Sequence, residues 1–128
     1  MSDFSAPVLR DLKTRSRGIC EGCGLAKATQ AHHRQYRSRG GLSDLANALH
    51  LCGSGNHTGC HGTAHTAKGE ALGWSIRSGF DPLVVPVLLV VDFVELWFTL
   101  VNEGAPALVH ELDAIEYLTL IRARKAVA

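Results

Sequence analysis

The chain has 128 residues, of which 46% are hydrophobic and 20% charged, and its formal net charge is +1. This composition excludes a disordered or fibrous protein, and the length fits one domain, since domains have roughly 100 to 200 residues. Residues 1–70 hold nine Lys/Arg against five Asp/Glu, and residues 71–128 hold four against seven, so we expect any nucleic-acid surface in the first part of the chain.

Residues 1–17 are polar and basic, and we interpret them as an N-terminal arm ahead of the core. A short amphipathic stretch from Val8 to Leu12 predicts either a loose arm or a short helix. The stretch from Met1 to Asp11 has no charged region followed by an apolar one, so a secretory signal is not expected. We therefore expect a cytoplasmic protein.

Residues 18–73 contain all four cysteines and six of the seven histidines. The short apolar run from Ala48 to Cys52 predicts a strand, with glycine-containing loops before and after it. The residues from His61 to Leu72 favour a helix, which Gly73 ends. This clustering of metal-binding residue types makes the segment the candidate functional core.

Residues 74–128 are expected to add a hairpin and a helix to the core. Two strands, Val84 to Phe93 and Glu95 to Val101, are followed by a turn at Asn102 to Gly104. The helix predicted from Val109 to Lys125 has an apolar face and basic residues at its C-terminal end.

The stretch from Leu83 to Val101 is apolar and long enough to raise the question of a membrane span. It is interrupted by Pro86, Asp92 and Glu95, and a charge near the centre of a span costs about 2.5 to 3.5 kcal/mol on insertion scales. Two buried strands are the better interpretation, and no membrane partner is expected.

The cysteines predict a structural zinc site. Cys20 and Cys23 form a C-x-x-C pair, and Cys52 and Cys60 can complete a tetrahedral four-cysteine site. The loop between Cys52 and Cys60 is longer than the two to about four residues of compact knuckles, so His57 within it is an alternative fourth ligand. A disulfide is not expected without a secretory signal, and a redox C-x-x-C does not require the second cysteine pair.

Four histidines are distinguished by their spacing. His61 and His65 are four residues apart on the predicted helix and project from one face, where two imidazoles can bind one metal ion. His32 and His33 are adjacent, so on an extended strand their side chains point to opposite faces, and one can join the metal site while the other stays beside it. Neutral histidine suits metal binding and base catalysis near pH 7, because its reference pKa is about 6.5. Two further histidines are interpreted as surface or core residues: His50 and His110.

Together these motifs resemble the HNH family of nucleases, also called ββα-metal or His-Me finger nucleases. The resemblance runs from about Ile19 to Gly73, a little under half of the chain, with specific order and spacing. The matching motifs are Cys20-x-x-Cys23, Ala31-His32-His33-Arg34, Arg37-Ser38-Arg39-Gly40-Gly41, Leu45-Ala46-Asn47-Ala48-Leu49, Leu51-Cys52, and Gly59-Cys60-His61 with His65. The Gly-Cys-His-Gly run and Asp81-Pro82 are similar to small HNH proteins encoded by tailed bacteriophages.

The resemblance implies a role for each matching residue. Three histidines would bind the catalytic divalent ion: His32, His61 and His65. His33 would be the general base, and Asn47 would orient the loop and the base, with Asn56 as a second candidate for that asparagine. The four cysteines would hold the structural zinc. The catalytic ion would be Mg²⁺, Mn²⁺, Ni²⁺ or Zn²⁺, and three imidazoles suit softer ions than Mg²⁺.

The fold class implied is α+β, a small zinc-stabilised ββα-metal core in residues 18–73 with a C-terminal β-hairpin and helix in residues 74–128. The core would pack a strand ending near His33 and the strand from Ala48 to Cys52 against the helix from His61. Zinc would replace much of the hydrophobic core that so small a motif lacks.

The predicted function is metal-dependent hydrolysis of DNA phosphodiester bonds, by nicking or by double-strand cleavage. A base must take a proton from water, and a cation must neutralise the charge that develops on the phosphoryl and leaving oxygens. Arg34, Arg37 and Arg39 would contact phosphates and so position DNA without reading its sequence, with solvated loop charges as the alternative. The phage likeness implies action with terminase subunits during genome packaging, in the host cytoplasm.

A second class of protein is compatible with part of this pattern. A non-catalytic zinc module that binds DNA or a packaging partner would keep the cysteines and the arginines. Such a module has no use for a free base at His33, so a DNA cleavage assay distinguishes the two.

Overall fold

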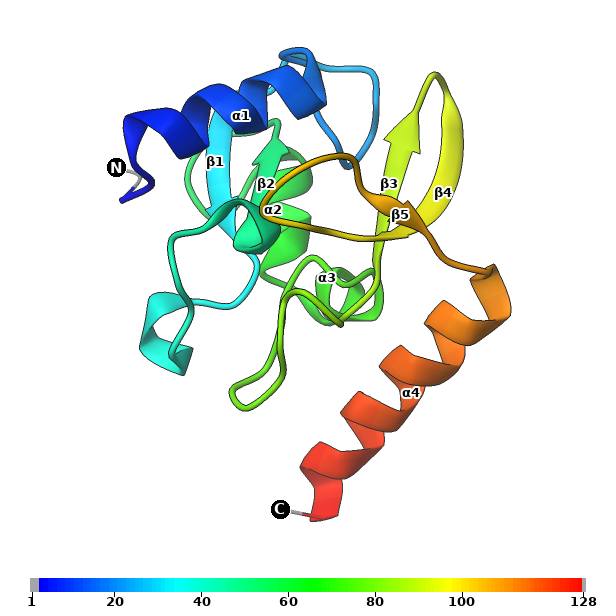
Figure 1. The fold of residues 1–128 in the computed structure, drawn as a ribbon. Coiled ribbons are helices and arrows are strands. Elements are labelled where there is room, and N and C mark those ends of the chain that lie inside the picture. The colour runs from blue at the N-terminus through cyan, green and yellow to red at the C-terminus, as the bar shows by residue number, and fades with distance from the viewer. Residues whose placement is uncertain (1–2, 128) are drawn as a thin grey trace.

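The computed structural model describes residues 3–127, with side chains described as far as Arg124. The structure contains both helices and antiparallel strands, so the predicted α+β class is confirmed (Figure 1). The elements are α1 (Ala6–Ser16), β1 (Gln30–His33), η1 (Arg37–Arg39), η2 (Leu45–Asn47), β2 (Ala48–Leu51), α2 (Gly59–Ala64), α3 (Ala67–Ala71), β3 (Val87–Val91), β4 (Val94–Thr99), β5 (Ala107–Leu108) and α4 (Glu111–Val127), where η denotes a 3₁₀ helix. Within this described part, β1 pairs with β2, and β3, β4 and β5 form a separate sheet.

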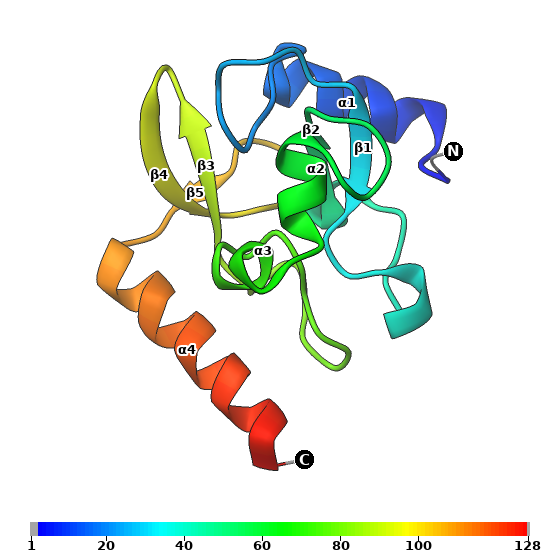
Figure 2. The same cartoon turned by 180° about the vertical axis from the view of Figure 1, so that it is seen from behind.

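The β1–β2 pair lies between α1 on one side and α2 on the other (Figures 1 and 2). The two strands are antiparallel, with His32 opposite Leu49 and His33 opposite Ala48. The apolar run of β2 is buried, and Leu49 and Leu51 belong to the largest cluster of the core. The predicted strand is therefore present and ends one residue earlier than expected.

α1 begins at a sequence suited to a helix start. The Ser5 side chain accepts a hydrogen bond from the backbone N–H of Val8, and Pro7 lies in the first turn. Leu12 is buried and belongs to one apolar cluster with Leu45. Residues 6–16 thus form a packed helix rather than a loose arm.

The helix predicted from His61 to Leu72 is two short helices, α2 and α3. α2 ends at Ala64, and the Thr66 side chain accepts a hydrogen bond from the backbone N–H of Gly69, which starts α3. A threonine in this position favours a new helix start over continuation of the old one. His61 and His65 still lie one helical turn apart, because His65 is the C-terminal cap of α2.

The predicted C-terminal hairpin is present as β3 and β4. The two residues of its turn, Asp92 and Phe93, have positive φ angles of 49° and 67°, as a type I′ hairpin turn requires. β3 begins at Val87 rather than Val84, because residues 81–86 form a turn that contains two prolines. The short strand β5, which was not expected, pairs with the far edge of β4.

α4 begins at Glu111, two residues later than predicted, and extends past the second sheet (Figure 1). Its buried residues Ala114, Leu118 and Ile121 share an apolar cluster with Trp97 of β4. None of the helices in residues 3–127 has the length and apolarity needed to cross a membrane.

Arg34, which was expected to contact DNA, is fully buried. Its guanidinium donates hydrogen bonds of 2.8 to 3.0 Å to four backbone carbonyls, those of Ala46, Gly73, Pro82 and Val85. The predicted phosphate contact is therefore wrong, because the side chain joins the end of β1 to the segment before β3 and does not reach the surface.

Replacing Arg34 with methionine is expected to lower the free energy of unfolding by at least about 3 kcal/mol. Three buried carbonyls and one partly buried carbonyl lose their donor, and each unsatisfied buried group costs about 1 to 3 kcal/mol. Urea unfolding measures the change. Arg37→Met is the matched control, since the Arg37 side chain is 68% exposed and surface substitutions usually change stability by less than about 0.5 kcal/mol. Equal stability of the two variants would contradict the buried role.

Candidate metal centres

Four cysteines from three parts of the chain form the first candidate centre, which we call the cysteine centre. Cys20 and Cys23 lie in the turn before β1, Cys52 follows β2, and Cys60 lies in the first turn of α2. Their Sγ atoms lie within 4.8 Å of one another, and those of Cys23 and Cys52 are 4.0 Å apart. Zn–S bonds of about 2.3 Å in a tetrahedron separate the sulfurs by about 3.8 Å, so this cluster can hold a metal ion.

The geometry selects between ligand sets that the sequence left open. None of the four cysteines is in a disulfide. His57 is exposed and lies outside the group of four, so it is not needed as a replacement ligand. A hydrogen bond with the Cys60 thiol lowers the pKa of Cys20, which favours the thiolate form that a metal ion binds.

The long loop between Cys52 and Cys60 closes because its two ends are glycines. Gly53 and Gly59 have positive φ angles of 106° and 62°. A Cβ at Gly59 would lie 2.7 Å from the Cα of Gly53, so the two backbones are in direct contact. The close approach lets the backbone N–H of Cys60 donate to Cys52 Sγ at 3.4 Å.

Three histidines form the second candidate centre, which we call the histidine centre: His32, His61 and His65. Their ligand nitrogens lie within 4.8 Å of one another, and the Nε2 atoms of His61 and His65 are 3.4 Å apart. Zn–N bonds of about 2.0 Å in a tetrahedron separate the nitrogens by about 3.3 Å. The three residues predicted to share an ion therefore come together at a distance that suits one.

In each of these imidazoles, one ring nitrogen is hydrogen-bonded to an oxygen atom. The contacts are His32 Nε2 to the Trp74 carbonyl at 2.8 Å, His61 Nδ1 to the Gly55 carbonyl at 2.6 Å, and His65 Nδ1 to the Tyr36 hydroxyl at 3.0 Å. A carbonyl only accepts, so His32 carries its proton on Nε2 and His61 on Nδ1. Histidines that ligate metals almost always have such an outer partner, which fixes the tautomer and the ring orientation.

Burial favours the neutral, metal-binding form of two histidines of the centre, His32 and His65. His32 is 2% exposed, and this burial lowers its pKa to about 3. Burial also lowers the pKa of His65. Metal binding requires a deprotonated imidazole, so these ligands need not lose a proton at neutral pH.

His33 lies beside the histidine centre without belonging to it. Although adjacent residues on a strand were expected to face opposite ways, His32 and His33 both line one cavity of about 220 Å³ that also includes His61 and His65. His33 Nε2 lies 3.2 Å from Ser43 Oγ, and the ring stacks on Phe4 with centroids 4.0 Å apart. Burial lowers the pKa of His33. The arrangement provides a held, neutral imidazole at the edge of a metal centre.

Asn47 is fully buried and organises the loop that carries Ser43. Its Oδ1 accepts from the backbone N–H of Gln35 at 2.7 Å, and its Nδ2 donates to the carbonyls of Gln35 and Leu42 at 3.0 and 2.8 Å. Asn47 thus acts on the neighbourhood of His33 through the backbone. Asn56, the second candidate, is exposed and lines the cavity itself.

Two of the predicted DNA-binding arginines reach the surface near the cavity. Arg37 is exposed, lines the cavity with His33 and pairs with Asp3. Arg39 is partly buried, lies 4.4 Å from the centroid of the Tyr36 ring, and donates to the Ile76 carbonyl at 3.1 Å. Arg39 is therefore packed against the protein, whereas Arg37 is a surface charge in an exposed ion pair.

Three residues of the site were not predicted from the sequence: Tyr36, Ser43 and Trp74. Tyr36 and Ser43 hold ring nitrogens of His65 and His33, and Trp74 acts on His32 through its backbone carbonyl. The backbone contact leaves no signal in the sequence. Tyr36 is four residues after His32, but the pairing with His65 depends on a contact across 29 residues.

No family model, no curated protein and no solved structure matches this chain. A functional proposal therefore stands on the geometry of the two centres and on the resemblance of the motifs.

Proposed function

We propose that this protein is a metal-dependent nuclease of the HNH type, which hydrolyses phosphodiester bonds in DNA. The observation that carries the proposal is the histidine centre with His33 beside it. Three imidazoles converge with their outer nitrogens bound to oxygens, and a fourth lines the same cavity without joining them. A metal site that only stabilises the fold needs no such additional base.

The order of the elements supports the proposal. β1, β2 and α2 are two antiparallel strands and a helix, with the paired histidines ending β1 and His61 on α2. The resemblance implies this order for a ββα-metal core. The cysteine centre joins the turn before β1 to the end of β2 and the start of α2, and we infer that it holds a structural zinc ion. Zinc there would add stability that so small a core lacks.

The chain's own residues suit hydrolysis by an activated water. His33 takes the proton of that water with Nδ1, since Nε2 is held by Ser43. Asn47 fixes the loop of Ser43 and so the direction of the ring. A divalent ion in the histidine centre would supply positive charge to the phosphoryl and leaving oxygens. Arg37, exposed at the same cavity, binds a phosphate oxygen and positions the strand.

The donor set ranks the candidate ions without selecting one. Imidazoles suit Ni²⁺ and Zn²⁺, whereas Mg²⁺ and Mn²⁺ prefer oxygen ligands. We propose one of these four ions as the catalytic cofactor, bound separately from the structural zinc.

Conversion of supercoiled plasmid to nicked or linear DNA tests the proposal, with each of the four ions added in turn and with EDTA as the control. Cleavage that depends on an added ion supports it. Binding of the plasmid without cleavage in any ion would contradict it and would favour the non-catalytic zinc module. The terminase partnership and the host cytoplasm stay predictions of the phage likeness.

His65→Ala is expected to weaken the binding of the catalytic ion by more than about 100-fold, because loss of an outer partner alone costs about 10- to 100-fold. Excess metal should restore part of the cleavage. Calorimetric titration of protein whose cysteine centre is already filled measures the affinity. His57→Ala is the control, since His57 is exposed and outside both centres. Equal metal affinity of the two variants would point to another site.

A further inference from the structure

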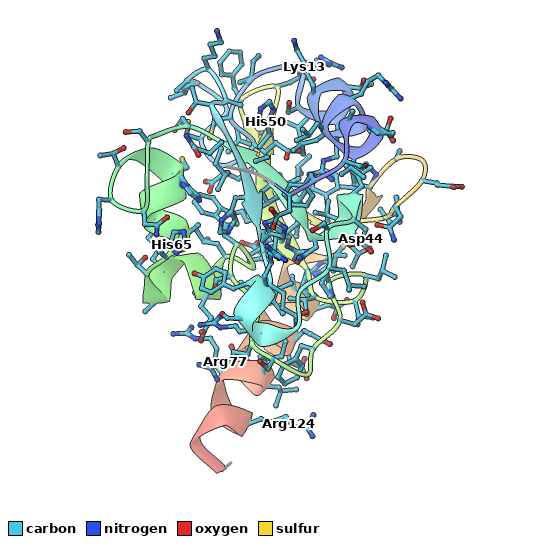
Figure 3. All side chains as sticks on the ribbon, turned by 90° about the vertical axis from the view of Figure 1, so that its left-hand side faces the viewer. Lys13, Asp44, His50, His65, Arg77 and Arg124 are labelled. Atoms are coloured by element: carbon cyan, nitrogen blue, oxygen red, sulfur yellow. The ribbon has the colours of Figure 1, made fainter. Side chains whose placement is uncertain are left out.

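A second cavity adjoins the histidine centre. It has a volume of about 460 Å³ and shares two lining residues, Tyr36 and His65, with the cavity of His33. Its lining also includes three arginines from separate parts of the chain: Arg39 of η1, Arg77 from the segment before β3, and Arg122 of α4. Figure 3 shows His65 and Arg77 on the same side of the molecule. We call this cavity the arginine pocket.

The charge of the arginine pocket suits an anion. Glu70 is the one acidic residue among its lining residues, and it pairs with Arg77 and, at 3.7 Å, with Arg122. Three arginines against one glutamate leave an excess of two positive charges. Hydroxyl groups of Thr66 and Ser75 complete a polar lining.

Two arginines contribute to the pocket in different ways. Arg77 is 17% exposed, its two Nη atoms are hydrogen-bonded within the protein, and its Nε is itself buried, so it contributes positive charge rather than a free donor. Arg39 makes its two hydrogen bonds, to Ser75 Oγ and to the Ile76 carbonyl, through Nη1. Its other nitrogens are therefore left for a ligand, while stacking on Tyr36 holds the guanidinium plane in place.

We propose that the arginine pocket binds a phosphate of the DNA strand next to the phosphate that is cut. This inference rests on the proposed nuclease function, which puts the cut phosphate at the histidine centre. Tyr36 and His65 line both cavities, so the two are neighbours, and successive phosphates of one strand rise by about 3.4 Å along the duplex axis. Arginine is suited to phosphate because its planar donors bind two oxygens at once.

The size of the pocket fits this ligand. Its volume of about 460 Å³ is roughly 15 times the share of one water molecule in the liquid, about 30 Å³. A phosphate group and several waters can therefore occupy it together. The net acidic C-terminal part of the chain would then contribute to DNA binding through Arg77 and Arg122.

Arg122→Ala tests the pocket, with Arg124→Ala as the matched control. Arg122 is exposed and only the pairing of its side chain with Glu70 is lost, so the variant should fold. Arg124 is exposed on the same helix and is not among the pocket's lining residues (Figure 3). Both changes are made in His33→Ala protein, so that DNA stays intact, and the affinity for a short duplex is measured by fluorescence anisotropy at several salt concentrations.

Arg122→Ala is expected to flatten the slope of log K against log[salt] by up to about 0.9, the contribution of one phosphate. Between 50 and 200 mM salt this makes the loss of affinity about 3.5-fold smaller than in the parent. Arg124→Ala should keep the parent slope, and Arg122→Lys should restore it. Equal slopes for Arg122→Ala and Arg124→Ala would overturn the proposal.

Neutral methylphosphonates, introduced one at a time around a mapped cut, locate the phosphate. Substitution next to the cut should weaken binding by the parent and have no further effect on Arg122→Ala. An effect several nucleotides away would overturn the placement of the pocket's phosphate.

The failures of the two proposals can be told apart. A protein that cuts DNA but shows equal salt slopes for Arg122→Ala and Arg124→Ala contradicts the pocket alone. A protein that never cuts DNA contradicts the proposed function. If its salt slope still depends on Arg122, the pocket binds phosphate and only its placement beside a cut is overturned.

Discussion

Replacing His33 with alanine is expected to slow DNA cleavage by about 10²- to 10⁴-fold, the usual contribution of a general base. His33 lies outside the histidine centre but lines its cavity, so the change removes the base and leaves the metal ligands. Single-turnover cleavage of supercoiled plasmid at saturating metal measures the rate. DNA affinity should stay close to that of the parent, because the phosphate contacts remain.

His110→Asn is the control for this experiment. His110 is exposed, and its Nδ1 accepts from the backbone N–H of Leu112 at 3.2 Å, an acceptor that asparagine retains. This variant should cut at the parent rate. Parent activity in His33→Ala would show that another group is the base. A loss of metal affinity as large as that of His65→Ala would make His33 a ligand instead.

Cys20→Ser is expected to abolish the binding of one tightly held zinc ion and to unfold the protein at ordinary temperature. Structural zinc contributes about 10 to 16 kcal/mol of apparent binding energy in finger peptides, as much as the whole stability of a typical domain, about 5 to 15 kcal/mol. Cys20 is 1% exposed, so no water reaches its position to replace the ligand. Elemental analysis counts the zinc, and circular dichroism follows unfolding.

The zinc-free parent is the matched control for Cys20→Ser. Once a chelator has removed the ion, the parent and the variant should unfold at nearly the same temperature, because serine differs from cysteine by one atom. A stable Cys20→Ser protein, together with a parent that contains no zinc, would contradict the structural role. If the unfolding temperatures of the zinc-free parent and of Cys20→Ser differ, Cys20 stabilises the fold by packing as well.

The grouping of the candidate metal ligands was predictable because their spacing is local. The pair Cys20 and Cys23 meets within one turn, and His61 and His65 meet within one turn of helix whether or not that helix continues. The prediction therefore survived the error in the length of the helix, which ends at Ala64 and restarts after Thr66. The two pairs come together through β1 and β2. The apolar run of residues 48–52 predicted β2, which ends at Leu51, whereas a strand ending near His33 was implied only by the resemblance.

The errors concern side chains whose partners are distant in the chain. Arg34 follows the histidine pair, in a position that suggested a surface cation. Its burial depends on carbonyls 12 to 51 residues away, and a backbone acceptor can belong to any residue type. The arginine pocket was missed for the same reason, because Arg122 is far in sequence from Tyr36 and lies on a helix whose basic residues were interpreted only as charges suited to its C-terminal end.

Trp74 links the two centres in a way that bears on mutational tolerance. Its carbonyl fixes the tautomer of His32, and every amino acid offers that carbonyl, so no substitution at position 74 can delete the acceptor. The indole, however, donates to the Leu88 carbonyl at 2.8 Å and lies so close to Gly22 that a Cβ there would be 2.7 Å from the ring. A smaller side chain at 74 would therefore loosen the cysteine turn and displace the acceptor of His32 in one event. The two centres share no ligand, but one substitution at Trp74 would disturb both.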